Sequence, residues 1–433
     1  MEATIAEVKS LSHEGRGVAS VDGKTVFIEG ALPGEKVSFT YRKRKPRFDE
    51  AKVLEILQAS PERTEPRCKH FSVCGGCSLQ HLDPKAQIEF KQKVVLEQLL
   101  HFGGVEPELV LPPILGSAFG YRTRARLGVK FVAKKAGVLV GFREKDPRYI
   151  ADLEHCDILH PSIGYSLLKL KALLSQLAAF KSIPQIEVAV GENQAALIFR
   201  NLLALQDSDQ EALINFGRQE GIAIYLQPAG PGSIFPLFTL GQDEFLRYSL
   251  PDFNLEFKFK PSDFTQVNPG INRQMVNKVI ELLAPQSSDR ILDLFCGLGN
   301  FTLALGRFAS KVVGVEGDPK MVERALQNAK ENNVLGAEFY AQPLHLPFET
   351  ASWAAQPFNK ILLDPPRTGA LECLPFLAKQ KASRIVYVSC NPATLARDLG
   401  ELVKKHKYQL KSLCVLDMFP HTTHVESIAV LER

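Results

Sequence analysis

The sequence has no long apolar run, and no stretch approaches the length of a membrane span. Its first residues, MEATIAEVKSLSHEGRG, lack the basic start and apolar core of a secretion signal. These absences favour a cytoplasmic protein without a membrane partner. In a reducing compartment the eight cysteines are not expected to form disulfides, so metal binding or catalysis better accounts for them.

The chain also carries little net charge, +4 over 433 residues. Hydrophobic residues make up 45% and charged residues 23%, which excludes pervasive disorder and a fibrous architecture. The length exceeds what one hydrophobic core usually organises and predicts two or three domains. No internal repeat or low-complexity tract is present.

Positive charge is instead concentrated in two segments. Between Lys36 and Phe48 there are six basic residues and no acid, with Tyr41 among them. Residues 121–148 carry nine basic residues, including Lys134 and Lys135, against two acidic ones. One such run is typical of a solvated face, but two runs in one chain favour a polyanionic partner, and aromatic neighbours suit stacked bases.

Three regions differ in their hydrophobic pattern. Residues 1–60 alternate short β-rich segments with turns, which predicts a small all-β barrel. Residues 61–262 mix strands with a helix-like segment at 162–180, which predicts an α+β domain. Residues 263–433 alternate strands and helices, which predicts an α/β doubly wound sheet with ligands at the carboxyl ends of its strands. The expected fold class is therefore multidomain.

A glycine-rich loop follows the first strand of the third region. Residues 290–295 lead into Cys296-Gly-Leu-Gly-Asn300, where glycines allow the backbone to approach a ligand closely. The next strand ends at Glu316, whose carboxylate can accept ribose hydroxyls. Phe301-Thr302 stands where a dinucleotide fingerprint has its third glycine, so S-adenosylmethionine is favoured over a nicotinamide dinucleotide. A purely structural turn with a solvated Glu316 is the alternative.

Two later strands end at the same predicted edge. The first ends in Asp364-Pro-Pro-Arg367 and the second in Ser389-Cys390. A cysteine just before a helix can have a lowered thiol pKa and act as a nucleophile, although for Cys390 taken alone a buried structural thiol is the favoured reading. Thiolate addition at uracil C6 would enable C5 to take a sulfonium methyl group, after which a base must remove the C5 proton. Glu426 is a candidate for that base.

These segments resemble the RNA uracil-5-methyltransferase family. The resemblance rests on DLFCGLGNF, LLDPPRTG, VYVSCNPATLARD and HTTHVESIAVL, with FTQVN upstream, and with the amino-terminal features it covers nearly the whole chain. It implies that Cys390 is the nucleophile and Glu426 the base. It also implies a set of contacts to S-adenosylmethionine, with the last member between cofactor and target base: Gln266, Phe295, Asn300, Glu316 and Asp364.

The chain departs from the family pattern at one position. Where such enzymes carry Asn or Asp near the adenine, this sequence has Pro343, preceded by Gln342. A proline has no amide hydrogen to donate, so Gln342 or a backbone carbonyl is the expected substitute there.

Four cysteines form a candidate metal site, three of them close in sequence and one distant: Cys68, Cys74, Cys77 and Cys156. Their spacing suits a [4Fe–4S] cluster and a tetrahedral zinc ion equally well, with unliganded thiols as a third reading. His70 or His155 could replace a sulfur. Similarity to the ribosomal-RNA members of the family implies a [4Fe–4S] cluster with a structural role. The other cysteines are expected to pack in the core: Cys296, Cys373 and Cys414.

The amino-terminal segments GRGVA and IEGALPGEKV are similar to a TRAM domain, an RNA-binding module. With the cysteines, this similarity implies methylation of a uridine in 23S ribosomal RNA, because the transfer-RNA branch of the family typically lacks both features. The expected partner is RNA, and no obligate protein partner is evident. The alternatives are a transfer-RNA uracil-5-methyltransferase, a non-catalytic RNA-binding iron–sulfur protein and a small-molecule methyltransferase.

Overall fold

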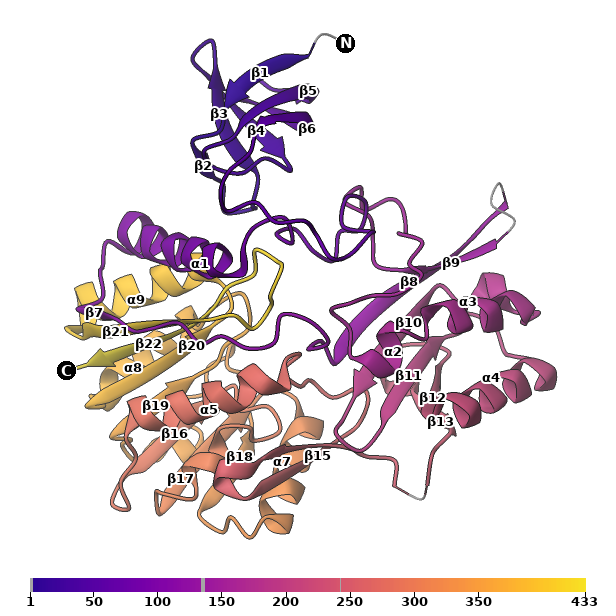
Figure 1. Cartoon of the computed structure of the whole chain (residues 1–433). Helices are drawn as coiled ribbons and strands as arrows, with labels where there is room; N and C mark the ends of the chain where they lie inside the picture. Colours follow the sequence, from indigo (N-terminus) through magenta and orange to yellow (C-terminus); the bar gives the residue numbers. More distant parts are fainter. Residues whose placement is uncertain (1–2, 134–136, 242) are drawn as a thin grey trace.

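The computed structural model describes residues 3–133, 137–241 and 243–433. Lys134 and Lys135 of the second basic segment and the first two residues of the predicted barrel lie outside these ranges. The described residues form sheets of six, six and eight strands and a separate two-stranded hairpin. In Figure 1 the amino-terminal sheet stands apart from the two larger bodies, to which a linker joins it. None of the helices in the described ranges is long and apolar enough to cross a membrane.

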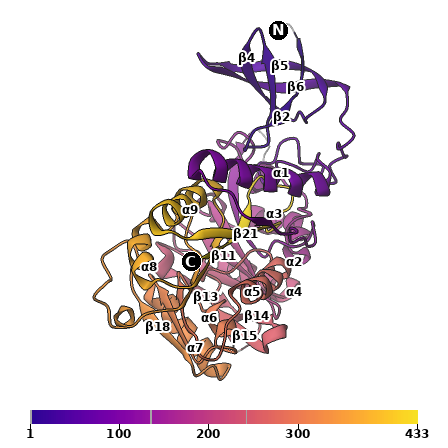
Figure 2. The ribbon, with the colours of Figure 1, turned by 90° about the vertical axis from the view of Figure 1, so that its left-hand side faces the viewer.

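The amino-terminal sheet confirms the predicted all-β module. Its strand order is β1-β5-β6-β4-β3-β2, and it curls around a small core that includes the fully buried Val26, Ile28 and Phe39 (Figure 2). Apolar residues point inward at alternate positions, as period-two patterning requires. The strands are β1 (Thr4–Glu7), β2 (Ser10–Leu11), β3 (Gly17–Val21), β4 (Lys24–Glu29), β5 (Lys36–Arg44) and β6 (Phe48–Gln58).

A buried ion pair anchors the linker to this module. Glu35 has no exposed surface, and its carboxylate accepts Arg63 Nε at 2.5 Å and Arg63 Nη2 at 2.9 Å. The same arginine nitrogen, Nη2, donates to the Gly30 carbonyl at 2.7 Å. The Leu32 amide also donates to Glu35, at 2.8 Å. These partners satisfy the buried charge on Glu35.

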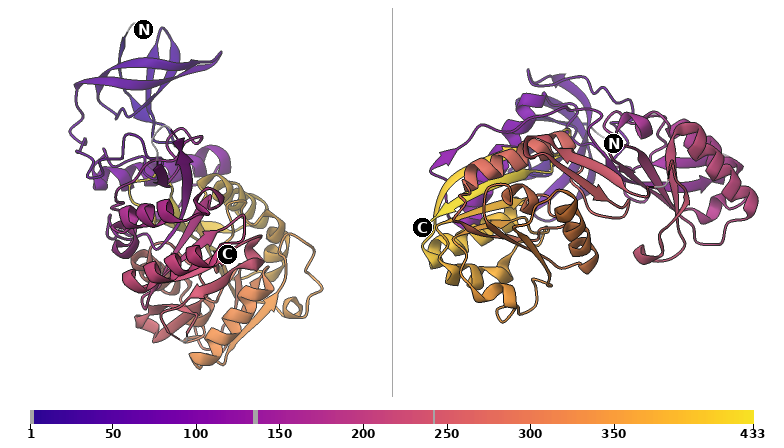
Figure 3. Two further views of the ribbon diagram at one scale, coloured as in Figure 1. Left: turned by 90° about the vertical axis from the view of Figure 1, so that its right-hand side faces the viewer. Right: turned by 90° about the horizontal axis from the view of Figure 1, so that it is seen from below.

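The central domain is a mostly antiparallel sheet with the strand order β13-β12-β11-β10-β8-β9. Helices lie against this sheet, as the ribbon views of Figure 3 show. The helix expected over 162–180 is broken, because the Gly164 carbonyl accepts the Cys156 amide at 3.0 Å instead of continuing a helix. The elements are β8 (Arg124–Val132), β9 (Gly137–Gly141), α2 (Pro161–Gly164), α3 (Leu167–Gln176), β10 (Gln185–Val190), β11 (Ala195–Arg200), α4 (Asp207–Glu220), β12 (Ile222–Gln227) and β13 (Phe235–Phe238).

The carboxyl-terminal domain contains the eight-stranded mixed sheet β18-β17-β16-β19-β20-β22-β21-β7. Five neighbouring strands are parallel: β16 (Arg290–Leu294), β17 (Lys311–Glu316), β18 (Ala337–Ala341), β19 (Lys360–Leu363) and β20 (Arg384–Ser389). Three strands extend them: β22 (Glu426–Glu432), antiparallel to β20, then β21 (Gln409–Leu416) and β7 (Leu109–Val110). The sequence pattern predicted the parallel strands β16, β17, β19 and β20, and missed both β18 and this extension.

Helices cover both faces of the sheet and give each face its own core. One core includes residues of α5 (Pro269–Leu283), α6 (Thr302–Leu305) and α7 (Pro319–Glu331). The other includes residues of α1 (Pro84–Gln98), α8 (Leu374–Gln380) and α9 (Pro392–His406). A short π-helical turn after α1 packs on α9, where Gly400 permits close approach: a Cβ added there would lie 2.7 Å from the Gly103 carbonyl oxygen.

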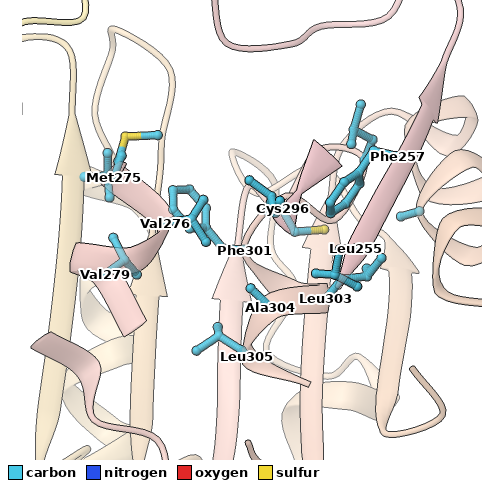
Figure 4. Close-up of a cluster of buried hydrophobic side chains, with 14 of the residues drawn as sticks. Leu255, Phe257, Met275, Val276, Val279, Cys296, Phe301, Leu303, Ala304 and Leu305 are labelled. Carbon is cyan, nitrogen blue, oxygen red and sulfur yellow. The ribbon is translucent and has the colours of Figure 1, made fainter. Parts of the chain in front are cut away.

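The hairpin of β14 (Leu246–Leu250) and β15 (Leu255–Phe259) packs on the carboxyl-terminal domain. The Lys258 amide donates to Asn328 of α7 at 2.9 Å. Figure 4 shows Phe257 of β15 close to Cys296 and Leu303, with Met275 of α5 on the other side of Phe301. Cys296 therefore packs in the core, as expected, and so do Cys373 and Cys414.

Candidate active site

Cys390 and Glu426 lie beside each other at one edge of the mixed sheet. Ser389 of β20 pairs with Ser427 of β22 in the antiparallel ladder, and the Ser427 hydroxyl donates to the Ser389 carbonyl at 3.3 Å. Cys390 follows the first of these residues and Glu426 precedes the second. Because directly opposed residues in such a ladder are about 5 Å apart at Cα, the side chains of Cys390 and Glu426 start from neighbouring positions.

The Cys390 thiol is half-buried, and its electrostatic surroundings oppose ionisation. Burial raises the pKa of Cys390 to about 11, with further upward contributions from Glu426 and Asp364, while Arg367 acts in the opposite direction. The expectation of a lowered thiol pKa is therefore wrong for the protein without ligands. The helix that follows starts two residues later, and its favourable field is smaller than the cost of desolvation.

Two carboxyl groups share this edge with the thiol. Glu426 is only 4% exposed, and burial together with Asp364 raises the pKa of Glu426 well above its ordinary value. Burial raises the pKa of Asp364, directly after β19, to about 7. The Asp364 carboxyl group therefore exchanges its proton near neutral pH, and both groups have the raised pKa values that are common among acid–base catalysts.

The loop after β19 is tied to the loop that carries the thiol. The carbonyl of Arg367 accepts Asn391 Nδ2 at 2.9 Å and the Thr394 hydroxyl at 3.2 Å. The Asn391 side chain also caps α9 by accepting the Ala393 amide at 3.1 Å. These contacts fix Cys390 between two anchored segments.

The glycine loop after β16 forms a backbone cradle. Phe295 has a φ of 66°, a left-handed value that is costly for a bulky residue and is often retained at functional sites. Its amide donates to the Val315 carbonyl at 2.8 Å. The Gly297 amide donates to Glu316 Oε2 at 3.1 Å, and a Cβ added to Gly297 would meet only Met321, at 3.9 Å. The cradle is thus open outward and bordered by an acid, as a ribose-bearing ligand requires.

The other residues predicted to contact S-adenosylmethionine have different surroundings in the structure. Asn300 Oδ1 accepts the Tyr248 hydroxyl at 2.9 Å and Asn272 Nδ2 at 3.0 Å, so its side chain is engaged within the fold. Neither partner was predicted, because β14 and α5 carry no motif that marks them. Gln266 is half-buried, two residues before the cap of α5. On the adenine side, the Gln342 amide donates to the Glu316 carbonyl at 2.8 Å.

The four predicted metal-binding cysteines line one small cavity together with apolar side chains that include Phe71, Phe142 and Leu153. Cys77 and Gln80 are in contact, with Gln80 Nε2 3.3 Å from the sulfur. Among the described residues no group of three or more His, Cys, Asp or Glu side chains is arranged to hold a metal ion. The structure thus brings the cysteines around one space, and their role as ligands stays a prediction.

The first basic segment presents stacked cation–aromatic pairs on the amino-terminal sheet. The Arg44 guanidinium lies 4.2 Å from the Tyr41 ring centroid, and Lys45 Nζ lies 4.5 Å from that of Phe48. Lys45 also pairs with Glu50 at 2.7 Å, which neutralises part of the predicted charge.

Comparison with known proteins agrees with this arrangement. The family described as tRNA (Uracil-5-)-methyltransferase matches residues 239–433, and the TRAM domain matches residues 2–54. A Nitrosococcus oceani protein named 23S rRNA (uracil(1939)-C(5))-methyltransferase is 53% identical over 431 residues, which are 99% of this chain and 96% of the relative. A protein of the same name from Hahella chejuensis is 49% identical over 100% of this chain and 98% of the relative.

A solved structure is similar over the whole length. It is the Pyrococcus abyssi tRNA (uracil-54, C5)-methyltransferase in complex with S-adenosyl-L-homocysteine, with a TM-score of 0.75 and 26% identity. The similarity covers 99% of each chain. The two chains therefore share their overall fold.

Proposed function

This chain belongs to the RNA uracil-C5-methyltransferase family, and on that premise we propose that it methylates C5 of a specific uridine in 23S ribosomal RNA, at the 1939-type site named for its relatives. S-adenosylmethionine is the proposed methyl donor. The observation that carries this proposal is the placement of Cys390 beside Glu426 at the sheet edge that also holds the glycine-loop cradle. RNA in the cytoplasm is the proposed partner.

Each side chain at the edge has a distinct proposed task. The Cys390 thiolate adds to C6 of the uracil, forming an S–C6 bond and placing an electron pair on C5. C5 takes the methyl group as the bond between that group and the donor's sulfur breaks, and this sulfur keeps the electron pair and becomes neutral. Glu426 then removes the proton from C5, the C5–C6 double bond forms again, and the S–C6 bond breaks to release the thiolate. Asp364 lies beside both groups. S-adenosylmethionine supplies a methyl group on a positively charged sulfur.

The cradle residues are proposed to hold the donor. The Glu316 carboxylate, oriented by two backbone amides, suits ribose hydroxyls. Phe295 and Gln266 are proposed to contact the donor from either side of the loop. Asn300 is proposed to act with its partners Asn272 and Tyr248, because its oxygen is already held by both.

The test is methylation of ribosomal RNA from a strain that lacks this protein. Parent protein should transfer labelled methyl groups to 23S RNA, and Cys390→Ala should give neither transfer nor a covalent RNA adduct. Glu426→Gln should form the adduct and fail to release it. Labelling of transfer RNA alone would favour the second candidate, a transfer-RNA methyltransferase, which the Pyrococcus similarity raises. RNA binding without any adduct in any variant would favour a non-catalytic protein.

We further propose a [4Fe–4S] cluster held by the four cysteines. Four sulfurs line a single small cavity, and thiolates are the usual ligands of such clusters. Anaerobically purified protein should contain iron and acid-labile sulfide in equal amounts and absorb visible light, whereas Cys77→Ser should lose both. Stoichiometric zinc without sulfide would overturn the cluster in favour of a zinc site.

A further inference from the structure

The loop between β21 and β22 has contacts with several segments that are distant from it in the sequence. We name residues 417–424 the base loop, because the proposed base Glu426 opens β22 directly after it. In Figure 1 this loop, in yellow, reaches from the carboxyl-terminal domain toward the linker beneath the amino-terminal sheet. Its contacts come from residues to which the proposed chemistry assigns no role.

Helix α1 supplies the buried polar contacts to the base loop. Lys91 has no exposed surface, and its Nζ donates to Asp417 Oδ1 at 2.6 Å and to the Phe419 carbonyl at 2.9 Å. Gln87 is 1% exposed, and its Oε1 accepts the His421 amide at 2.9 Å. Gln87 Nε2 donates to the Leu82 carbonyl at 2.8 Å, which fixes its orientation.

The segment after Cys77 holds the same loop from another side. The amides of Ser78 and Leu79 both donate to the His421 carbonyl, at 2.8 and 2.9 Å. His421 has a φ of 65°, a left-handed conformation that persists only where the surroundings determine it. The Tyr121 hydroxyl of the central domain donates to the Pro420 carbonyl at 3.1 Å.

The amino-terminal sheet also touches the base loop. A Cβ added to Gly15, in the turn between β2 and β3, would lie 2.8 Å from Thr423 Cγ2 and 3.0 Å from Leu79 Cδ2. The loop is therefore a junction of all three domains. Burying a charged amine is costly unless the amine is fully paired. The pair of Lys91 and Asp417 therefore favours the one loop conformation in which both partners meet.

We propose that Gln87 and Lys91 are positioning residues that hold the base loop so that Glu426 stays beside Cys390. This inference rests on the proposed function. It concerns only the second half of the proposed reaction, in which the C5 proton is removed and the cysteine is released. Formation of the S–C6 bond needs Cys390, whereas proton removal and release of the cysteine need Glu426. Displacement of the base loop should therefore slow release of the RNA adduct more than its formation.

The test compares adduct formation and release on 23S RNA with S-adenosylmethionine. Lys91→Met and Gln87→Met should each release the adduct at least about ten-fold more slowly than the parent, because each variant loses two buried hydrogen bonds and one such bond already corresponds to about ten-fold. Formation of the adduct should change little. Lys93→Met is the matched control, because Lys93 lies on the exposed face of α1. It should behave as the parent.

Four outcomes separate the possibilities. Slow release with normal formation in Gln87→Met, which removes no charge, supports the proposal even if Lys91→Met does not fold. Parent-like release in both folded variants would overturn it, and so would an equal loss of formation and release, which indicates destabilisation alone. If Glu426→Gln formed no adduct, this result would contradict the proposed function itself.

Discussion

At the scale of single residues, the thiol of Cys390 must become a nucleophile in surroundings that oppose its ionisation. Burial, Glu426 and Asp364 raise its pKa to about 11. A ligand with a positively charged sulfur would offset the two carboxyl groups, and so the thiol would ionise chiefly when the donor is present. The unliganded enzyme is thereby protected from unproductive reactions of the thiol.

This balance predicts slow alkylation of Cys390 in the free protein. At pH 8 a thiol with a pKa of about 11 has about one hundredth of the thiolate of one with a pKa of 9, because each unit is a factor of ten. Iodoacetamide labelling of the Cys390 peptide, followed by mass spectrometry, should rise steeply with pH. S-adenosylmethionine should increase it at pH 8, while an uncharged analogue without the sulfonium should not. Rapid labelling at pH 7 without the donor would contradict the electrostatic picture.

Asp293 of β16 is fully buried and gives the protein a pH-dependent stability. Its Oδ2 accepts the Thr302 hydroxyl at 2.6 Å, its Oδ1 has no partner among the described residues, and burial raises its pKa to about 8. The folded protein thus keeps a proton that the unfolded chain releases near pH 4. The free energy of unfolding should therefore fall as pH rises between about 4 and 8, by up to about 1.4 kcal/mol per unit.

Asp293→Asn should remove this dependence, because the carboxamide keeps the acceptor and cannot ionise. The measurement is the Tm of the carboxyl-terminal domain at pH 5 and pH 8. From pH 5 to pH 8 the Tm of the parent should fall further than the Tm of the variant. Equal losses would show that Asp293 is already ionised in the fold.

At the scale of elements, the hairpin β14–β15 supports the glycine loop through Tyr248. Its hydroxyl donates to Asn300, and its ring stacks on Phe257 with centroids 4.7 Å apart. Tyr248→Phe keeps the stacking and removes one hydrogen bond from the cradle. We expect the Kd for S-adenosylmethionine to rise about three- to ten-fold, the equivalent of one such bond, measured by calorimetry. Tyr340→Phe, on β18, is the control and should leave the Kd unchanged.

The sequence was sufficient for elements that carry periodic patterns or motifs. Four of the parallel strands, β16, β17, β19 and β20, were predicted together with the glycine loop and the cysteine after β20, because short apolar strands alternate with amphipathic helices there. The fifth parallel strand, β18, was not predicted. The sequence was also not sufficient for β21 and β22. Their residues are buried on both faces, so no alternation reveals them, and the pairing that places Glu426 beside Cys390 depends on contacts distant in sequence.

The raised pKa of Cys390 could not be predicted for a related reason. A cysteine before a helix suggests a lowered value, but burial of the thiol is the largest cause of the raised pKa, and the depth of that burial follows from tertiary packing. The contacts of Gln87 and Lys91 likewise carry no local signal, because a lysine in a polar helix is usually exposed. Tertiary packing alone makes these residues functional candidates.

At the scale of the whole molecule, the amino-terminal sheet can guide RNA only if its position is fixed. The ion pair of Arg63 and Glu35 ties the linker to the sheet, and Lys145 of the central domain lies 3.4 Å from Glu29 of β4. The Arg63–Glu35 pair is the more buried of these two links. Breaking it should therefore loosen the position of the amino-terminal sheet more than breaking the other link.

Arg63→Met should loosen the linker, since it leaves the buried Glu35 carboxylate without its cation. Breaking such a pair typically costs about 3–5 kcal/mol, enough to populate open states of the linker. Hydrogen exchange should increase around Ser60 and Leu32, whose amides donate to Glu35. KM for 23S RNA should rise, while the Kd for S-adenosylmethionine stays constant because the cradle is distant. Lys145→Met, which breaks the more exposed link, should change both quantities little. An unchanged KM in Arg63→Met, despite faster exchange, would show that RNA binding does not depend on a fixed amino-terminal sheet.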